Sequence, residues 1–277
     1  LIGYLNPRVA RALHARDVVA GAKVFRRTVA PVYLRRNQED VLTELPDKIE
    51  VEDWVQFTTH DERAYVNAVR SGNFMAMRQA AYASGVDSAK LARLGDIVGE
   101  AAINDWKVIV FSYLRGVLDA IGTTLGPSVA GVLTGSVPAR ARQNVIAEFS
   151  ARAGHAVLLS QIEAGGTGLN IQAASIVVLA EPQWKPSTEH QAIARAYRMG
   201  QVRKVHVHRL LAKASVDERV REVLERKSKL FDAYARHSDA KESDARAVDG
   251  TWHGDEPPIA AQREIIDAER RRLGIST

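Results

Sequence analysis

Short apolar runs separated by amphipathic stretches dominate residues 106–212. The runs are rich in valine, isoleucine and leucine: Val108–Phe111, Val129–Leu133, Val157–Leu159, Ile176–Leu179 and Val205–Val207. Helical patterns fill most of the intervals, at Leu114–Leu125, Ala139–Ala151 and Ser187–Met199. Strands of this kind that alternate with helices pair in parallel, through right-handed crossovers, and both faces of their sheet are covered. We therefore expect an α/β domain in which helices flank a parallel sheet.

The segments before residue 106 have a different pattern. Residues 1–45 are basic with a helical pattern, and Pro46 disfavours helix at Leu45. An extended piece, Ile49–Phe57, follows, and helical patterns start at Asp61 and at Ser88. The pattern predicts a basic helical segment over 1–46 and a helical connecting region over 47–105.

A further helix is expected from Ser215, because Ser215 and Glu218 have the spacing of a capping box. The composition becomes polar beyond residue 236, and Ile259–Leu273 is predicted to form a short terminal helix. The predicted domain organisation is completed by the α/β lobe over 106–235 and a polar tail with a short helix over 236–277.

The charge distribution allows an anionic partner. The chain of 277 residues has 38 Lys and Arg against 33 Asp and Glu, a formal net charge of +5. Residues 236–277 hold 7 basic and 9 acidic side chains, so the net charge of +7 falls on residues 1–235. This excess is compatible with nucleic-acid binding but does not require it. The absence of cysteine excludes disulfides, thiolate zinc sites and cysteine nucleophiles. Because no signal-peptide pattern or membrane span is evident, we expect a soluble, cytoplasmic protein without membrane contact.

The strongest candidate for chemistry is QAIARAYRMGQ, Gln191–Gln201. In a helix, Gln191, Arg195 and Arg198 would share one face, since they are spaced i, i+4, i+7. Two guanidinium groups that point together can stabilise the charge on a phosphoryl group in transfer. The alternative for two arginines alone is a solvated basic helix face.

A glycine-rich segment, AGGTGLN at Ala164–Asn170, follows the third apolar run of the α/β region. Glycines let the backbone approach an anion closely, although a tight turn is the alternative explanation. The sequence contains no Walker A element, and its acidic pairs Asp61-Glu62 and Asp217-Glu218 do not follow apolar strands as a Walker B acid does. We therefore expect neither a phosphate loop nor a magnesium site. The closely spaced His206 and His208 have no evident third metal ligand.

Four motifs in order resemble motifs IV to VI of superfamily-two helicases: FSYL at Phe111–Leu114, LTGS at Leu133–Ser136, LSQIEAGGTGLN at Leu159–Asn170, and QAIARAYRMGQ. The chain is specifically similar to the Swi/Snf-type DNA translocases, above all to the bacterial members, over residues 25–235. Residues 181–186, Glu-Pro-Gln-Trp-Lys-Pro, depart from this family, which more often has an aspartate and Trp-Asn-Pro.

The resemblance implies a RecA-like second motor lobe. The stretch Tyr33–Pro46 resembles the passage from the first motor lobe to the second, so residues 1–46 would be the end of the first lobe or a linker. In that family ATP and Mg²⁺ are bound mainly by the first lobe, and the second lobe supplies arginine fingers. The resemblance assigns the fingers to Arg195 and Arg198, with Gln191 orienting them. The resemblance implies that the glycine-rich segment, including Gly166, Gly168 and Asn170, couples the nucleotide state to DNA. The residues near the phosphates of one DNA strand would be Ser112, Thr134, Gly135 and Ser160.

We therefore expect the chain to be the C-terminal lobe of a double-stranded-DNA translocase, with duplex DNA and a first motor lobe as its partners. Alone it should hydrolyse no ATP, because catalysis of phosphoryl transfer depends on groups positioned across the cleft. The alternative is a nucleic-acid or protein-interaction module with the same fold and no catalytic role.

Overall fold

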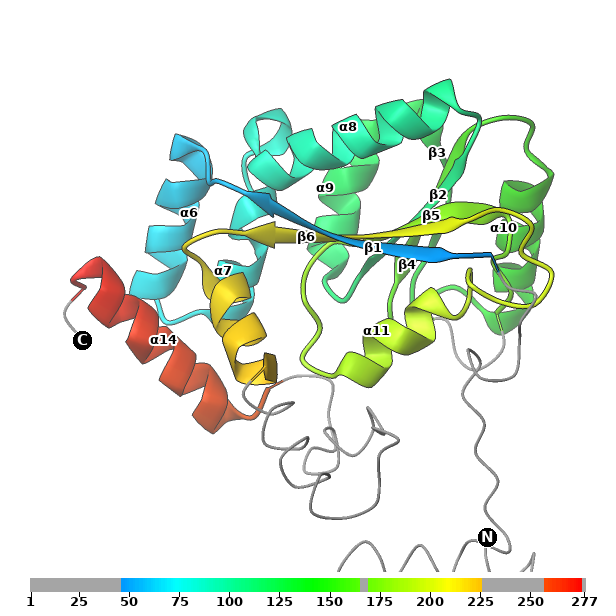
Figure 1. The fold of residues 1–277 in the computed structure, drawn as a ribbon. Helices are drawn as coiled ribbons and strands as arrows, with labels where there is room; N and C mark the ends of the chain where they lie inside the picture. Colours follow the sequence, from blue (N-terminus) through cyan, green and yellow to red (C-terminus); the bar gives the residue numbers. More distant parts are fainter. Residues whose placement is uncertain (1–45, 165–168, 226–256, 276–277) are drawn as a thin grey trace, which may run out of the picture.

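A parallel six-stranded sheet forms the centre of the molecule (Figure 1). The computed structural model describes residues 46–164, 169–225 and 257–275. The strands are β1 (Lys48–Val55), β2 (Lys107–Ser112), β3 (Val129–Leu133), β4 (Ala156–Gln161), β5 (Ala174–Leu179) and β6 (Val205–Ala212). Their order is β1-β6-β5-β2-β4-β3, and every pairing is parallel. The expected α/β fold is confirmed.

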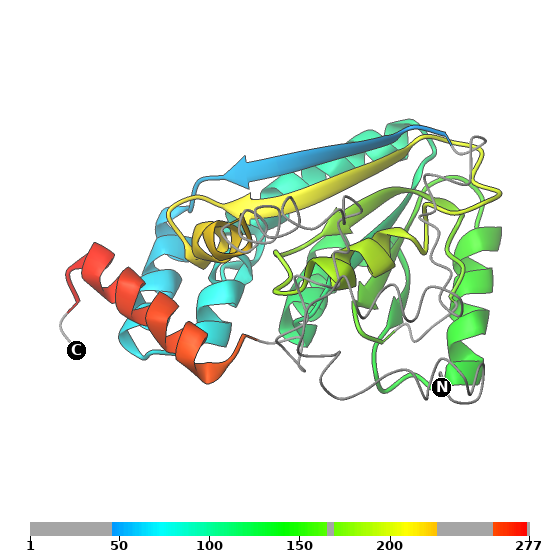
Figure 2. The ribbon, with the colours of Figure 1, turned by 60° about the horizontal axis from the view of Figure 1, so that its bottom comes forward.

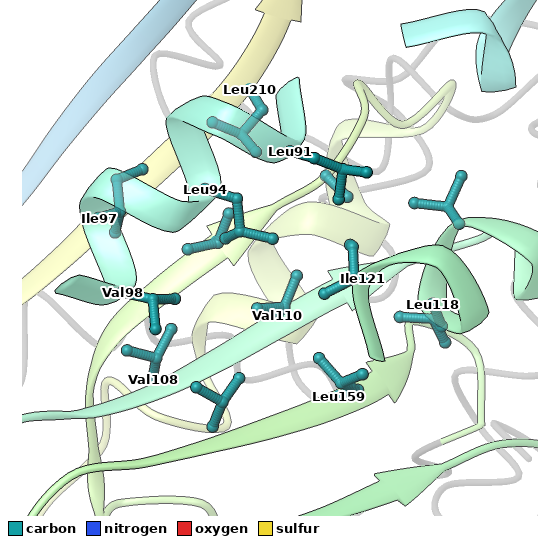
Figure 3. Packing of buried hydrophobic residues seen from close by; sticks show 14 of the residues in the cluster. Leu91, Leu94, Ile97, Val98, Val108, Val110, Leu118, Ile121, Leu159 and Leu210 are labelled. Atoms are coloured by element: carbon teal, nitrogen blue, oxygen red, sulfur yellow. The ribbon is translucent and has the colours of Figure 1, made fainter. Parts of the chain in front are cut away.

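Among the described residues, two helices pack on each face of the sheet. Both faces are apolar because successive strand residues point to opposite sides. Helices α8 (Ala89–Ile103) and α9 (Arg115–Leu125) lie on the face of Val108 and Val110. Figure 3 shows this packing. Helices α10 (Ala139–Ala151) and α11 (Pro186–Ile193) pack on the face of Ile109 and Phe111. The central strands are therefore buried on both sides, as their uninterrupted apolar sequences predict.

The first strand belongs to the same sheet as the α/β lobe. β1 pairs with β6 along its whole length, from Lys48 opposite Val205 to Val55 opposite Ala212. Helix α8 packs in the same core as β2. The segment 47–105 thus contributes a strand and a helix to the sheet domain, and the boundary predicted at residue 106 stays a prediction.

A smaller helical cluster flanks the end of the sheet at which β1 and β6 finish. It contains α6 (Thr59–Arg70), α7 (Phe74–Gln79), the helical residues 216–225 and α14 (Ile259–Leu273), and its core includes Tyr65, Met77, Val220 and Ile266. Three 3-10 turns, Ala80–Tyr82, Gly85–Asp87 and Gly126–Ser128, complete the described elements. Figure 2 shows α14 alongside the α6 side of this cluster.

The helix expected over Ile259–Leu273 is confirmed as α14, and hydrogen bonds attach it to α6 and to the helical residues 216–225. Glu269 of α14 is fully buried and accepts hydrogen bonds from Tyr65 Oη (3.0 Å), Arg219 Nε (2.9 Å) and Arg272 Nη2 (2.6 Å). Arg270 Nε donates to the carbonyl of Val69 (3.2 Å). The arginines of this helix are therefore docking groups as well as solvated charges.

The N-terminal cap of the helical residues 216–225 differs from the capping box predicted for Ser215 and Glu218. The Ser215 hydroxyl accepts the amide of Asp217 (3.1 Å), not that of Glu218. The Asp217 carboxylate accepts the amide of Ala212 (2.9 Å) and pairs with buried Lys90 (2.7 Å). The buried ion pair of Asp217 and Lys90 therefore contributes to holding the start of this helix. In the part of the chain that the structure describes, no helix is both long and apolar enough to cross a membrane.

Candidate nucleotide and nucleic-acid sites

The four residues predicted to lie near DNA phosphates meet at the carboxyl edge of the sheet. Ser112 ends β2 opposite Gln161 of β4, and Ser160 lies opposite Leu133, the last residue of β3. Thr134 and Gly135 continue directly from β3. Because β2, β4 and β3 are neighbours, their carboxyl ends form one continuous polar edge.

The loop after β3 is held by side chains from two other elements. Gly135 donates its amide to Gln161 Oε1 (3.2 Å), and Thr134 Oγ1 lies 2.7 Å from Ser136 Oγ. Arg142 of α10 donates to the carbonyls of Val137 (2.8 Å) and Gly135 (3.3 Å). Arg142 thus supports this surface. Gln161 lies in the motif Leu159–Asn170, but the sequence assigned it no role of its own; in the structure it holds this loop through the Gly135 amide.

The two serines of this edge are enclosed, unlike the loop. Ser112 is 0% exposed, and its hydroxyl lies 2.9 Å from Glu181 Oε2 and accepts the amide of Leu114 (3.0 Å). Ser160 is also 0% exposed, and its hydroxyl lies 3.2 Å from the carbonyl of Gln161. Gly135 is exposed, so the loop presents the accessible part of the predicted contact surface. Direct phosphate contact by Ser112 and Ser160 stays a prediction.

The predicted helix Ser187–Met199 ends early. Helix α11 stops at Ile193, and Arg195 and Arg198 lie in the turns that follow. The prediction that Gln191, Arg195 and Arg198 share one continuous helical face is therefore wrong.

Contacts from distant parts of the sequence explain why this helix ends early. The side-chain amide of Gln201 donates to the carbonyls of Gln172 (3.0 Å), Ala174 (3.0 Å) and Ala196 (3.3 Å). Gly200 has φ +91°, a conformation that no helix contains. These long-range hydrogen bonds override the local helical pattern.

Arg195 lies across the apolar face of the sheet. Its guanidinium carbon is 5.7 Å from the centre of the Phe111 ring, and burial lowers its pKa. Its Nη1 atom is buried without a hydrogen-bond partner in the described part of the chain. A half-buried guanidinium in this state favours an anionic partner, because a buried charge is costly unless it is paired. Gln191 and Arg198 are exposed.

The glycine-rich segment is described only in part. Gly166 and Gly168 lie outside the described residues. Asn170 is exposed and donates from its side chain to Gln172 Oε1 (3.0 Å), while the amide of Ile171 donates to the carbonyl of Arg195 (2.9 Å). The end of this segment therefore lies beside the arginine segment 195–198.

In the described ranges, no group of three or more His, Asp or Glu side chains is arranged to hold a metal ion. His208 Nδ1 lies 2.8 Å from Asp53 Oδ2, and His206 packs 5.5 Å from the Trp106 ring. Burial is the largest cause that lowers the pKa of His206, with His208 and Lys204 adding to it. Both histidines thus have structural partners.

Comparison with known proteins identifies the region that holds the predicted site residues. Residues 89–200 match the family model described as the helicase conserved C-terminal domain. The uncharacterized ATP-dependent helicase MG018 of Mycoplasma genitalium is 28% identical over 75% of this chain and 23% of its own length. The DNA repair protein RAD5B of Arabidopsis thaliana is 39% identical over 45% of this chain and 10% of its own length. The chain thus spans about a quarter or less of the length of these relatives.

The fold is that of known SWI2/SNF2 ATPase lobes. The C-terminal part of the Fun30 ATPase domain superposes with a TM-score of 0.66 and 16% identity, covering 84% of this chain and all of that one. The Sulfolobus solfataricus SWI2/SNF2 ATPase core in complex with double-stranded DNA gives a TM-score of 0.55 and 22% identity, covering 86% of this chain and 59% of that one. The RecA-like fold is confirmed. Relatives come from bacteria and eukaryotes alike, so the bacterial origin stays a prediction.

Proposed function

We propose that this chain is the second motor lobe of a Swi/Snf-type, ATP-dependent translocase of double-stranded DNA. The match to the helicase C-terminal domain and the shared fold support the family. The observation that carries the catalytic part of the proposal is Arg195, whose half-buried guanidinium has an unpartnered Nη1 atom. A charge held in this way is ready for an anion that another component supplies.

ATP fits this arrangement only as a ligand shared with another lobe. The described residues offer guanidinium groups for a polyphosphate but no cluster for Mg²⁺, so the metal would be held by the first motor lobe. Bound ATP supplies the phosphoanhydride bond whose hydrolysis drives the motor. Arg195 and Arg198 would stabilise the negative charge that develops on the transferred group, as arginine fingers do. Exposed Gln191, at the last turns of α11, would orient this segment.

Duplex DNA would bind along the carboxyl edge formed by β2, β4 and β3. The exposed loop at Gly135 offers the accessible groups, and Thr134, Ser112 and Ser160 are buried behind it. Contacts of this kind go to phosphates and carry no sequence information. The glycine-rich segment, with Gly166, Gly168 and Asn170, would connect this edge to the arginine segment.

Paired arginine substitutions test the catalytic half of the proposal. Arg195→Ala with Arg198→Ala, measured with a first motor lobe supplied, should lower DNA-stimulated ATP hydrolysis by about 10³-fold or more while leaving duplex affinity within about twofold. Arg203→Ala removes an exposed arginine beyond the segment and serves as the control. Loss of affinity with turnover retained would support the non-catalytic binding module instead.

A further inference from the structure

The segment 181–186, in which the chain departs from its family, forms a buried polar connection. Glu181 is 0% exposed, and its carboxylate accepts the amide of Tyr113 (2.6 Å) and the side-chain amide of Gln183 (3.0 Å). Its second oxygen lies 2.9 Å from the Ser112 hydroxyl. The loop after β5 is thereby fixed to the end of β2, on the edge proposed to contact DNA.

The connection continues into α11. The backbone amide of Gln183 donates to Glu189 Oε1 (3.0 Å), and Arg209 Nε donates to Glu189 Oε2 (2.9 Å). Glu189 lies in the first turn of α11 and is 8% exposed. Arg209 is held in turn by Glu50 of β1 (2.7 Å). Each oxygen of the Glu189 carboxylate thus faces a donor from a different element.

We infer that Glu189 is a positioning residue that couples the DNA-contacting edge of the sheet to the arginine segment at the far end of α11. The chain of contacts runs from Ser112 and Tyr113 through Glu181 and Gln183 to Glu189. The buried hydrogen bonds strengthen one another in a medium of low dielectric, so this connection is stiff. A displacement at the edge therefore reaches α11 as a whole. This inference rests on the proposed function, which places DNA at that edge.

The chemistry of the two carboxylates makes the coupling testable. In Glu189→Gln the amide nitrogen must face either the Gln183 amide or Arg209 Nε, both of which are donors, so one hydrogen bond is lost. In Glu181→Gln the amide nitrogen can instead donate to Ser112 Oγ, while the remaining oxygen keeps both of its donors. Glu181→Gln therefore serves as the conservative variant. Glu269→Gln, a buried carboxylate in the separate helical cluster, is the control for simple destabilisation.

The experiment is amide hydrogen exchange on this chain, with and without a short duplex of mixed sequence. In the wild type, the duplex should slow exchange in the loop 134–137 and also in residues 187–193. In Glu189→Gln the loop should stay protected, while residues 187–193 should exchange about tenfold faster than in the duplex-bound wild type, or about 1.4 kcal/mol. Glu181→Gln and Glu269→Gln should keep both effects.

The outcomes separate the two proposals. Protection of the loop without protection of residues 187–193 in the wild type, or full protection of both in Glu189→Gln, would overturn the coupling and leave the DNA edge intact. Absence of protection in the wild type would overturn the DNA edge itself, and the coupling with it. If Glu189→Gln does not fold, Gln183→Leu cuts the side-chain bond to Glu181 and carries the same two outcomes.

Discussion

The guanidinium carbon of Arg195 lies 5.7 Å from the centre of the Phe111 ring. The arginine segment after α11 therefore reaches the strand whose last residue is Ser112, although 84 residues separate Phe111 from Arg195 in the sequence. The contact supports a planar cation on an aromatic surface and leaves Nη1 without a partner in the described residues. The two proposed sites are thus physically linked through β2.

Arg195→Lys tests whether geometry or charge alone matters at this position. Lysine keeps the positive charge but lacks the planar group of several donors, so turnover with a first motor lobe and duplex DNA should fall at least about tenfold. The midpoint of thermal unfolding, measured in parallel, should change little, because Nη1 has no hydrogen bond in the described part of the chain to lose and a lysine keeps a cation near the Phe111 ring. Wild-type turnover in this variant would contradict the finger assignment.

Arg142→Gln tests the loop after β3. The substitution removes the hydrogen bonds to the carbonyls of Val137 and Gly135, so the loop loosens and duplex affinity should fall about fivefold. Arg152→Gln removes the same charge at the other end of α10, where the Arg152 guanidinium donates to the carbonyl of Pro127 (3.1 Å), away from the loop after β3. Titrations by fluorescence anisotropy at several salt concentrations check both variants. Equal losses of affinity would mean that net charge, not the loop, determines binding.

Gly131→Ala tests the packing of β3 against α10. A Cβ atom at Gly131 would lie 2.5 Å from Val145 Cγ1, so the Val145 side chain or one of the two elements must shift. Overpacking of this kind should lower the free energy of unfolding by about 1–3 kcal/mol. Gly99→Ala, in exposed space on α8, should instead raise it by about 0.5–1 kcal/mol. Urea denaturation of both variants measures the difference, and a neutral Gly131→Ala would contradict the described packing.

Glu269 makes the attachment of α14 dependent on pH. Burial opposes ionisation of this carboxyl, but hydrogen bonds from Arg272 and Arg219 outweigh it and hold its pKa below the ordinary value of 4.5. A carboxyl with a lowered pKa in the folded state stabilises the protein above its unfolded pKa, and this stability is lost as the pH falls through the folded pKa. The free energy of unfolding should therefore fall as the pH decreases below about 4.5.

The matched variant isolates this effect. At pH 7, Glu269→Gln should be less stable than the wild type by about 2 kcal/mol, because the half-buried guanidinium groups of Arg219 and Arg272 lose the buried anion that they share. The difference should shrink as the pH falls from 4.5 through the lowered pKa of the folded state, because the wild-type carboxyl then also becomes neutral. Denaturation curves between pH 3.5 and pH 7 provide the check. A difference that stays constant over this range would contradict a lowered pKa of Glu269 in the folded protein.

The sequence predicted elements that local pattern determines. The valine- and isoleucine-rich strands, α10 and α14 were predicted closely, because burial on both sheet faces and helical periodicity are encoded in consecutive residues. The end of α11 was not, since Gln201 stops it through carbonyls that belong partly to another segment. The entry of β1 into the main sheet was missed for the same reason: its partner β6 lies about 150 residues away.

The candidate sites divide in the same way. Motif order pointed to Thr134, Gly135 and Arg195, whose positions the structure brings to the sheet edge and to the end of α11. Gln161 and Glu189 were given no role, and Glu181 was noted only as a departure from the family pattern. Their roles depend on partners that the fold brings close and the sequence keeps apart. Ser112 is 69 residues from the carboxylate that binds it.

The most direct test of the central claim is ATP hydrolysis by this chain, alone and with a separately expressed first motor lobe, each with and without duplex DNA. The account predicts no turnover by the chain alone and DNA-stimulated turnover in the mixture, abolished by Arg195→Ala with Arg198→Ala. Turnover by the chain alone would contradict the account, because it would require a complete phosphate and magnesium site within these 277 residues.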